Sequence, residues 1–148
     1  MKAKDLMIGD LVYIKAYKAD ENFQMVEFQK PVRIAGIENI VTVEDPSNDK
    51  EPYRMFGNTE IEPIPLTLEI LKKNGFSKFV AGQYLCANKE EDWFILVMPG
   101  LHTAPNSKHR YLVSCKHIYT DAKIAINYVH ELQNALRLCG IEKEIIAY

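Results

Sequence analysis

The clearest periodic pattern in the chain lies between positions 120 and 140, in the segment TDAKIAINYVHELQNALRLCG. Apolar residues recur there at spacings of three and four, which lines one side of an α-helix. The stripe consists of Ala125, Val129, Leu132, Leu136 and Cys139, widened by Ile124, Tyr128 and Ala135. The pattern therefore predicts a helix from Thr120 to Cys139 that lies across a sheet, with Thr120 as N-cap and Gly140 ending the helix.

The first half of the chain follows the shorter period of β-strands. β-Branched and aromatic residues predict four short strands, at Leu11–Lys18, Phe23–Gln29, Val32–Ile37 and Ile40–Glu44. The polar segment Asp45–Pro52 predicts a surface loop, and Tyr53–Ile61 predicts one more extended segment. Closely spaced strands of this kind predict a small antiparallel sheet or an SH3-like barrel.

The second half alternates helix and strand signals. Thr67 and Gly75 predict the start and the end of a short helix, Leu68–Asn74. The segment Asp92–Met98 is apolar on both alternating faces from Trp93 onwards, which predicts a central strand covered on both sides. Further strands are predicted at Phe76–Ala87, Arg110–Ile118 and Ile141–Tyr148.

The order of these elements predicts an α+β fold. A small N-terminal antiparallel sheet or SH3-like barrel is followed by a second antiparallel sheet that one long C-terminal helix packs against. The prolines at Pro63 and Pro65 stiffen the chain between the two parts. We therefore expect a β subdomain at 1–62 and an α+β subdomain at 63–148, either separate or joined in one compact unit.

Charge and cysteine content narrow the function classes. The 148 residues carry a net charge of −2 with both signs scattered, so no overall field attracts nucleic acid or an anionic membrane. The three cysteines are far apart and form no C-x-x-C pair, which predicts buried free thiols in a reducing compartment. No apolar run is long enough for a signal peptide or a membrane span, so we expect a cytoplasmic protein without membrane contact.

Motifs of cofactor and catalytic chemistry are absent from the sequence. There is no G-x-G-x-x-G, Walker A, G-x-S-x-G or H-E-x-x-H pattern. No cofactor, metal site or catalytic residue is therefore predicted.

The polar side of the predicted helix is the first candidate site. It carries Asn127, His130, Asn134 and Arg137 at spacings of three or four. Such a row is typical of a solvated helix face, and it also suits a recognition surface for a protein partner.

Basic residues form a second candidate site. Lys108, His109 and Arg110, with Lys116 beyond, are the densest cluster, and Trp93 or Tyr111 offers a ring on which a base could stack. The alternative is a solvated strand edge that resists aggregation. In the N-terminal half, Lys15, Lys18, Lys30 and Arg33 line predicted strands, but Asp20, Glu21 and Glu27 cancel most of their field. Any nucleic-acid binding is therefore expected to be weak and salt-dependent.

Cys115 and His117 form a third candidate site. They are two residues apart on a predicted strand, so they share a face that His102 or His109 could approach. This arrangement suggests a Cys/His hydrolase or a metalloprotein. The alternative is a cysteine buried in the core.

Two stretches resemble a known group of sequences. They are Ile61–Phe76, IEPIPLTLEILKKNGF, and Tyr128–Asn134, YVHELQN. The chain resembles a family of small uncharacterised proteins of anaerobic gut bacteria and their phages, which join I-x-P-I-P-L-T to a late Y-V-H-x-L-Q-N helix, although Glu131 and the Leu138–Gly140 ending depart from that pattern. The resemblance implies a phage or mobile-element setting and no activity. The joint presence of the two stretches is explained if the segment 63–67 packs against the late helix, with His130, Gln133 and Asn134 tying that helix to nearby backbone.

The first hypothesis for the function is a non-enzymatic binding or adaptor protein with a protein partner. Nucleic-acid binding is the second, and a Cys/His hydrolase or metalloprotein is the third.

Overall fold

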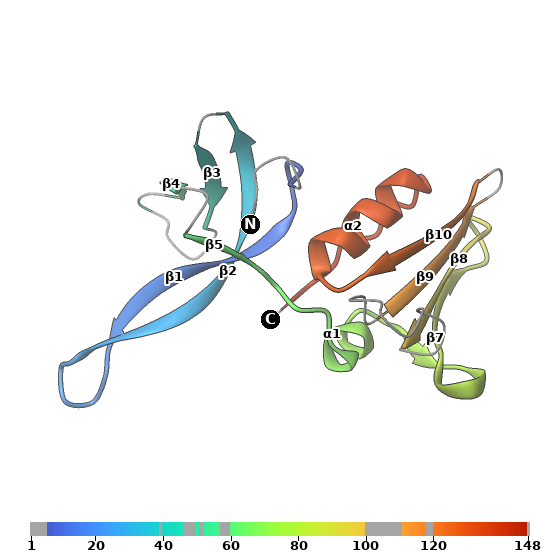
Figure 1. Cartoon of the computed structure of the whole chain (residues 1–148), viewed down its shortest axis with the longest axis horizontal. Coiled ribbons are helices and arrows are strands. Elements are labelled where there is room, and N and C mark those ends of the chain that lie inside the picture. The colour runs from blue at the N-terminus through green and yellow to red at the C-terminus, as the bar shows by residue number, and fades with distance from the viewer. Residues whose placement is uncertain are drawn as a thin grey trace. The chain divides into compact units, whose positions relative to one another are not determined.

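The structure is a computed structural model that describes residues 6–38, 40–45, 50, 52–56, 60–99, 111–117 and 120–147. The chain divides after Ile64 into two compact units, Met1–Ile64 and Pro65–Ile146. Within the described residues each unit contains one antiparallel sheet of five strands (Figure 1). These sheets and the C-terminal helix confirm the predicted α+β class.

The first unit contains five strands in the spatial order β4-β3-β2-β1-β5. Their bounds are Leu11–Ala19 for β1, Met25–Ile37 for β2, Val41–Glu44 for β3, Tyr53–Phe56 for β4 and Ile61–Pro63 for β5. No ladder between β4 and β5 closes the sheet in the described ranges, so an open sheet, the first of the two predicted alternatives, describes this unit.

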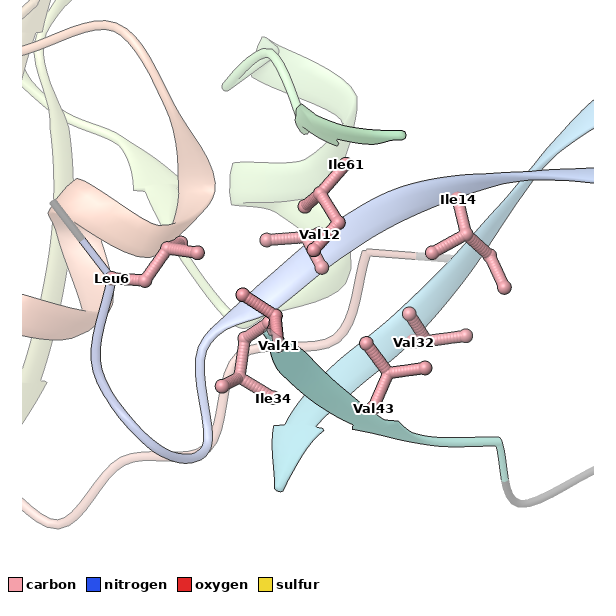
Figure 2. Close-up of a cluster of buried hydrophobic side chains, with 8 residues drawn as sticks. All are labelled: Leu6, Val12, Ile14, Val32, Ile34, Val41, Val43 and Ile61. Carbon is pink, nitrogen blue, oxygen red and sulfur yellow. The ribbon is translucent and has the colours of Figure 1, made fainter. Parts of the chain in front are cut away.

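The core of the first unit is formed by aliphatic side chains on one face of this sheet (Figure 2). Val12 and Val32 lie opposite each other in the ladder and therefore on one face. The eight buried members are Leu6, Val12, Ile14, Val32, Ile34, Val41, Val43 and Ile61. Ile37 and Phe56 pack against this cluster and are partly buried.

The prediction of two strands at 23–29 and 32–37 is wrong, because one strand, β2, covers both. Pro31 does not interrupt it and lies opposite Tyr13 in the ladder with β1. β3 pairs with β2 only from Arg33 onwards. Pro31 thus lies where β2 has one described neighbour, which is where a strand tolerates a residue without an N–H.

The outer halves of β1 and β2 extend past their neighbours. β5 pairs with β1 only at Val12–Ile14, and β3 pairs with β2 only between Arg33 and Ile37. Residues 15–19 and 25–29 therefore have only each other as ladder partners among the described residues. We call this two-stranded segment the ribbon, and its turn, residues 20–24, the tip (Figure 1).

The second unit contains the strands β10-β9-β8-β7-β6 in that spatial order. Their bounds are Ser77–Lys78 for β6, Tyr84–Asn88 for β7, Trp93–Pro99 for β8, Tyr111–His117 for β9 and Thr120–Ile126 for β10. The single-turn helix η2, Val80–Gly82, lies between β6 and β7.

The short helix α1, Leu68–Lys73, begins as predicted and ends one residue before the predicted Asn74, which is its C-cap. The Ile70 N–H donates to Oγ1 of Thr67, which is the N-cap, at 3.2 Å. Gly75 follows the helix in the left-handed region with φ of 79°.

β8 has the central position that its sequence predicts, between β7 and β9. Its alternate residues Trp93, Ile95 and Val97 are buried. The prediction that both faces are covered is not met by the described residues, since Phe94 is 37% exposed and Leu96 and Met98 are only half-buried. An apolar run therefore located the strand without determining what covers its second face.

The prediction of one helix from Thr120 to Cys139 is wrong in its first third. Residues 120–126 form β10, and α2 occupies only Val129–Leu138. Tyr128, not Thr120, is the N-cap residue. Ile124 and Ile126 fit a strand as well as a helix, and their pairing with Val113 and Tyr111 of β9 decides in favour of the strand.

The C-terminal end of α2 follows the prediction. Gly140 has φ of 68°, and its N–H donates to the Arg137 carbonyl at 3.0 Å. The Ile141 N–H donates to the Leu136 carbonyl at 2.9 Å, which completes a Schellman motif. Of the α-helices in the described ranges, α1 and α2, neither is long and apolar enough to cross a membrane.

The predicted final strand at 141–148 is wrong for the described residues 141–147, which form no strand. Ile141 and Ile145, four residues apart, are the buried residues of this segment. The backbone of Ile146 bonds to the Asn74 side chain instead of a strand, with its N–H donating to Oδ1 at 2.8 Å and its carbonyl accepting from Nδ2 at 2.7 Å. The buried Asn74 side chain thus makes the backbone hydrogen bonds that a neighbouring strand would otherwise make.

The beginning of the second unit is attached to the start of α2. The Leu66 N–H donates to the Asn127 carbonyl at 2.9 Å, and Pro65 forms an isolated β-bridge with Tyr128. The expected packing of the segment 63–67 against the late helix is thus met only by contacts of Pro65 and Leu66 with Tyr128 and Asn127, which lie just before α2. Glu131, which departs from the resembled family, caps α2, because its Oε2 accepts from the N–H groups of Asn127 and Tyr128 at 2.6 and 3.1 Å.

Candidate functional site

The candidate site is a cleft in the first unit, beside the ribbon. Ala16 and Phe28 face each other in the ladder, as do Ile14 and Lys30, so the ribbon face that enters the cleft continues the face that carries the core. The cleft has a volume of about 620 Å³ and is lined by Lys15, Ala16, Tyr17, Phe28, Lys30, Asp45, Arg54, Phe56 and Glu60. Its volume is typical of sites that hold a small ligand or a few side chains.

Two aromatic rings in the cleft each form a cation–π contact. Nζ of Lys18 lies 5.5 Å from the centroid of the Phe28 ring. Cζ of Arg54 lies 5.3 Å from the centroid of the Phe56 ring. Each contact contributes about 0.5–1 kcal/mol at a partly exposed site, enough to orient the cation over the ring.

The two lysines that line the cleft, Lys15 and Lys30, form ion pairs with carboxylates. Nζ of Lys30 lies 2.6 Å from Oδ2 of Asp45, whose side chain is only 3% exposed. Nζ of Lys15 lies 3.2 Å from Oε1 of Glu27, and both side chains are about half exposed. The hydrogen bond to Glu27 raises the pKa of Lys15, and the hydrogen bonds from Lys15 and Tyr17 lower the pKa of Glu27. The cleft therefore combines aromatic walls with charges that are already balanced, as the mixed signs of the sequence predict.

The predicted recognition row on the late helix is not one exposed face. His130 is 4% exposed and stacks on Tyr128, with ring centroids 5.8 Å apart. Asn127 and Asn134 are half-buried, and the exposed Arg137 donates to Oδ1 of Asn134 at 2.9 Å. Because α2 buries a wide arc that includes Gln133, His130 lies on the packed side. This burial corrects the placement of His130 on the polar face.

The predicted nucleic-acid residues do not form a described surface. Trp93 is 9% exposed, and its Nε1–H donates to Oε2 of Glu91 at 2.6 Å. Its ring is therefore not an open platform for a base. Lys108, His109 and Arg110 lie outside the described residues.

Cys115 is packed beneath α2. It is 1% exposed, and the Cys139 thiol donates to its carbonyl at 3.8 Å. Burial, followed by the neighbouring Cys139, raises the pKa of the Cys115 thiol to about 12. A thiol that stays protonated at neutral pH is a poor nucleophile and a poor metal ligand. The side chain of His117 and the whole of His102 and His109 lie outside what is described, and no cluster of three metal-binding side chains occurs among the described residues.

The raised pKa of Cys115 predicts a specific pH dependence of stability. The folded state holds the thiol proton more tightly than the unfolded state, so stability is fully present below the unfolded pKa near 9 and falls as pH rises towards 12. Between pH 9 and 10.5 the free energy of unfolding of the wild type should fall more steeply than that of Cys115→Ala, as measured by urea titrations at each pH. Parallel slopes for the two proteins would contradict the burial of a protonated thiol.

Sequence reasoning named two residues that line the cleft but predicted no cleft. Lys15 and Lys30 stand out in the sequence as strand-face cations, and Glu27 as an acid that offsets them. It missed Phe28, Arg54 and Phe56, because they join the cleft only through the ladder register of β1, β2, β3 and β4.

The fold and the cleft define a small α+β protein with two antiparallel sheets and a charge-balanced aromatic cleft on the first. Comparison of the chain with protein-family models, with curated proteins and with solved structures gives no match in any of the three. Inferences about function therefore rest on the cleft itself.

Proposed function

We propose that the protein is a non-enzymatic binding or adaptor protein whose cleft takes a segment of a protein partner. The observation that supports this proposal is the pairing of aromatic walls with a balanced set of charges in one cavity. Aromatic residues and arginine are enriched where proteins bind each other, and a few buried anchors supply most of the affinity. Tyr17, Phe28, Arg54 and Phe56 are of this kind.

The charge balance favours a protein segment over a strongly charged ligand. Lys30 is held by Asp45, and Lys15 by Glu27, so these ammonium groups are partly neutralised before a ligand arrives. A peptide that brings apolar side chains together with both donors and acceptors matches such a cleft better than a polyanion does. The setting we propose is the cytoplasm of a phage-carrying or mobile-element-carrying cell, on the basis of the sequence resemblance alone.

The charge reversal Arg54→Glu tests the proposal. Arg54 is exposed, so its reversal should leave folding intact while it removes the cation over Phe56 and reduces recovery of a bound partner at least about tenfold. The measurement is quantitative mass spectrometry of proteins co-purified with the tagged full chain. Lys89→Glu, at an exposed cation in the turn after β7, is the matched control. Equal recovery with both variants, or no reproducible partner with the wild type when an untagged copy of the chain is present and counted as a partner, would refute the proposal.

Nucleic-acid binding is the second candidate function. Two rings of the cleft have a cation over them, Lys18 over Phe28 and the lining residue Arg54 over Phe56, and single strands bind to surfaces of this composition. A binding titration tests this candidate. Labelled single-stranded and duplex oligonucleotides are titrated at low salt with the wild type and with Arg54→Glu. Binding that is lost both with the variant and on raising the salt would favour this candidate, and no binding of either probe excludes it.

A further inference from the structure

The tip of the ribbon holds a phenylalanine in a conformation that suits glycine. The Asp20 carbonyl accepts from the Phe23 N–H at 3.0 Å, and the Asp20 N–H donates to the Gln24 carbonyl at 2.8 Å. Oδ1 of Asp20 also accepts from the N–H groups of Asn22 and Gln24, both at 2.8 Å. In this well-bonded turn Phe23 has φ of 61°, a left-handed position that hairpin loops usually give to glycine or asparagine.

The same residue is also almost fully exposed. The Phe23 side chain is 91% accessible, the highest value for a large apolar residue in the described ranges. Tyr17, Met25 and Val26 on the adjoining strands are 58%, 67% and 43% exposed. Backbone strain and apolar exposure are both unfavourable for an isolated chain, and a combination of this kind indicates a functional contact.

The composition of the tip complements that of the cleft. Beside Phe23 the tip carries the carboxylates of Asp20 and Glu21, and no cation occurs between Ala19 and Val26. The cleft offers the rings of Phe28 and Phe56 to a phenyl group, and the exposed guanidinium of Arg54, the lining cation outside the two ion pairs, to the carboxylates. The phenyl group of the tip thus matches the rings of the cleft, and the carboxylates of the tip match its positive charge.

We propose that the tip of one copy inserts Phe23 into the cleft of a second copy of this chain. This inference rests on the proposed function of the cleft and identifies its partner. Tip and cleft lie on the same ribbon, with the Ala16–Phe28 pair roughly 15 Å from the turn at about 3.3 Å per residue. Two ribbons that lie antiparallel across a two-fold axis place each tip at the other copy's cleft, which gives a closed, isologous dimer.

A lipid surface is the competing occupant for an exposed phenyl group. The two carboxylates beside Phe23 disfavour it, because they would lose hydration on insertion and would be repelled by anionic headgroups. The second copy supplies the Arg54 guanidinium for these carboxylates and is therefore the better match.

Sedimentation equilibrium of the full chain, from low to high micromolar concentration, tests the proposal. The wild type should form dimers, and Phe23→Gly should weaken dimerisation at least about tenfold. Glycine suits the left-handed turn, so the melting temperature of Phe23→Gly should equal or exceed that of the wild type, which separates lost docking from lost folding. Met55→Ser, at an apolar residue that is 70% exposed on β4, is the control and should still dimerise.

Complementation between two variants provides a stricter test. Phe23→Gly keeps the cleft and Arg54→Glu keeps the tip, so an equimolar mixture should form a heterodimer through one tip–cleft contact, at concentrations where each variant alone is monomeric. A monomeric wild type, or a mixture that stays monomeric, overturns the proposal. Co-sedimentation of the monomeric wild type with phosphatidylcholine vesicles, lost in Phe23→Gly, would overturn it in favour of a lipid surface.

The proposed function can survive the failure of this inference. If the wild type is monomeric but Arg54→Glu still removes a co-purified protein, the cleft binds a different partner and only the second-copy assignment is wrong. If Arg54→Glu affects neither dimerisation nor partner recovery, both proposals are wrong.

Discussion

Leu132→Ala is expected to destabilise the second unit by about 2–5 kcal/mol. Leu132 is fully buried on α2, so truncation removes apolar contacts and leaves a cavity in a packed interior. The measurement is urea unfolding followed by the fluorescence of Trp93, the single tryptophan of the chain, which is buried in the same unit.

Leu138→Ala is the matched control for Leu132→Ala. It lies on the same helix but is 71% exposed, so its loss should stay within about 0.5 kcal/mol. Equal destabilisation by the two variants would show that a different face of α2 is packed. The comparison therefore tests the helix register as well as the core.

Asn74→Ala is expected to cost the second unit about 3 kcal/mol. Asn74 is 6% exposed, and its side-chain amide makes three hydrogen bonds, to the Ile70 carbonyl at 2.8 Å and to the carbonyl and N–H of Ile146. Alanine removes the three hydrogen bonds that the amide makes to these backbone groups. Each lost hydrogen bond lowers the free energy of unfolding by roughly 1 kcal/mol or more. Urea unfolding measures the loss, and hydrogen exchange at the Ile146 amide should accelerate in the variant.

Asn134→Ala is the control for this second prediction. Asn134 is half-buried and accepts a hydrogen bond from the exposed Arg137, so its replacement should change the free energy of unfolding by less than about 0.5 kcal/mol. If Asn74→Ala costs no more than this control, the amide does not hold the C-terminal segment in place.

Local signals in the sequence predicted the elements that local chemistry determines. Thr67 and Gly75 delimit α1, and Gly140 ends α2, because a cap depends on its own few residues. The segment 120–126 was predicted as helix because its apolar positions fit both periods. Its pairing with β9 decides the outcome, and no short window of sequence contains that partner.

The cleft illustrates the same limit for function. Its lining comes from β1, β2, the end of β3, β4 and the residue before β5, so proximity depends on ladder register across the whole sheet. Candidates chosen by spacing alone, such as His130 and Cys115, are instead buried in the second unit. Spacing places residues on one face of an element but does not show whether that face is packed.

The hydrogen bond between Leu66 and Asn127 affects the order in which the two units can fold during synthesis. During synthesis the first unit has all its strands by Pro63, and these can pair while later residues are still being added. The second unit starts with a segment whose hydrogen-bond acceptor, the Asn127 carbonyl, is translated about 60 residues later, and the Asn74–Ile146 bonds span 72 residues. A nascent chain that stalls before Asn127 therefore exposes the apolar segment Ile64–Leu66 without its partner, and the bonds that Asn74 makes to Ile146 can form only once Ile146 has been added.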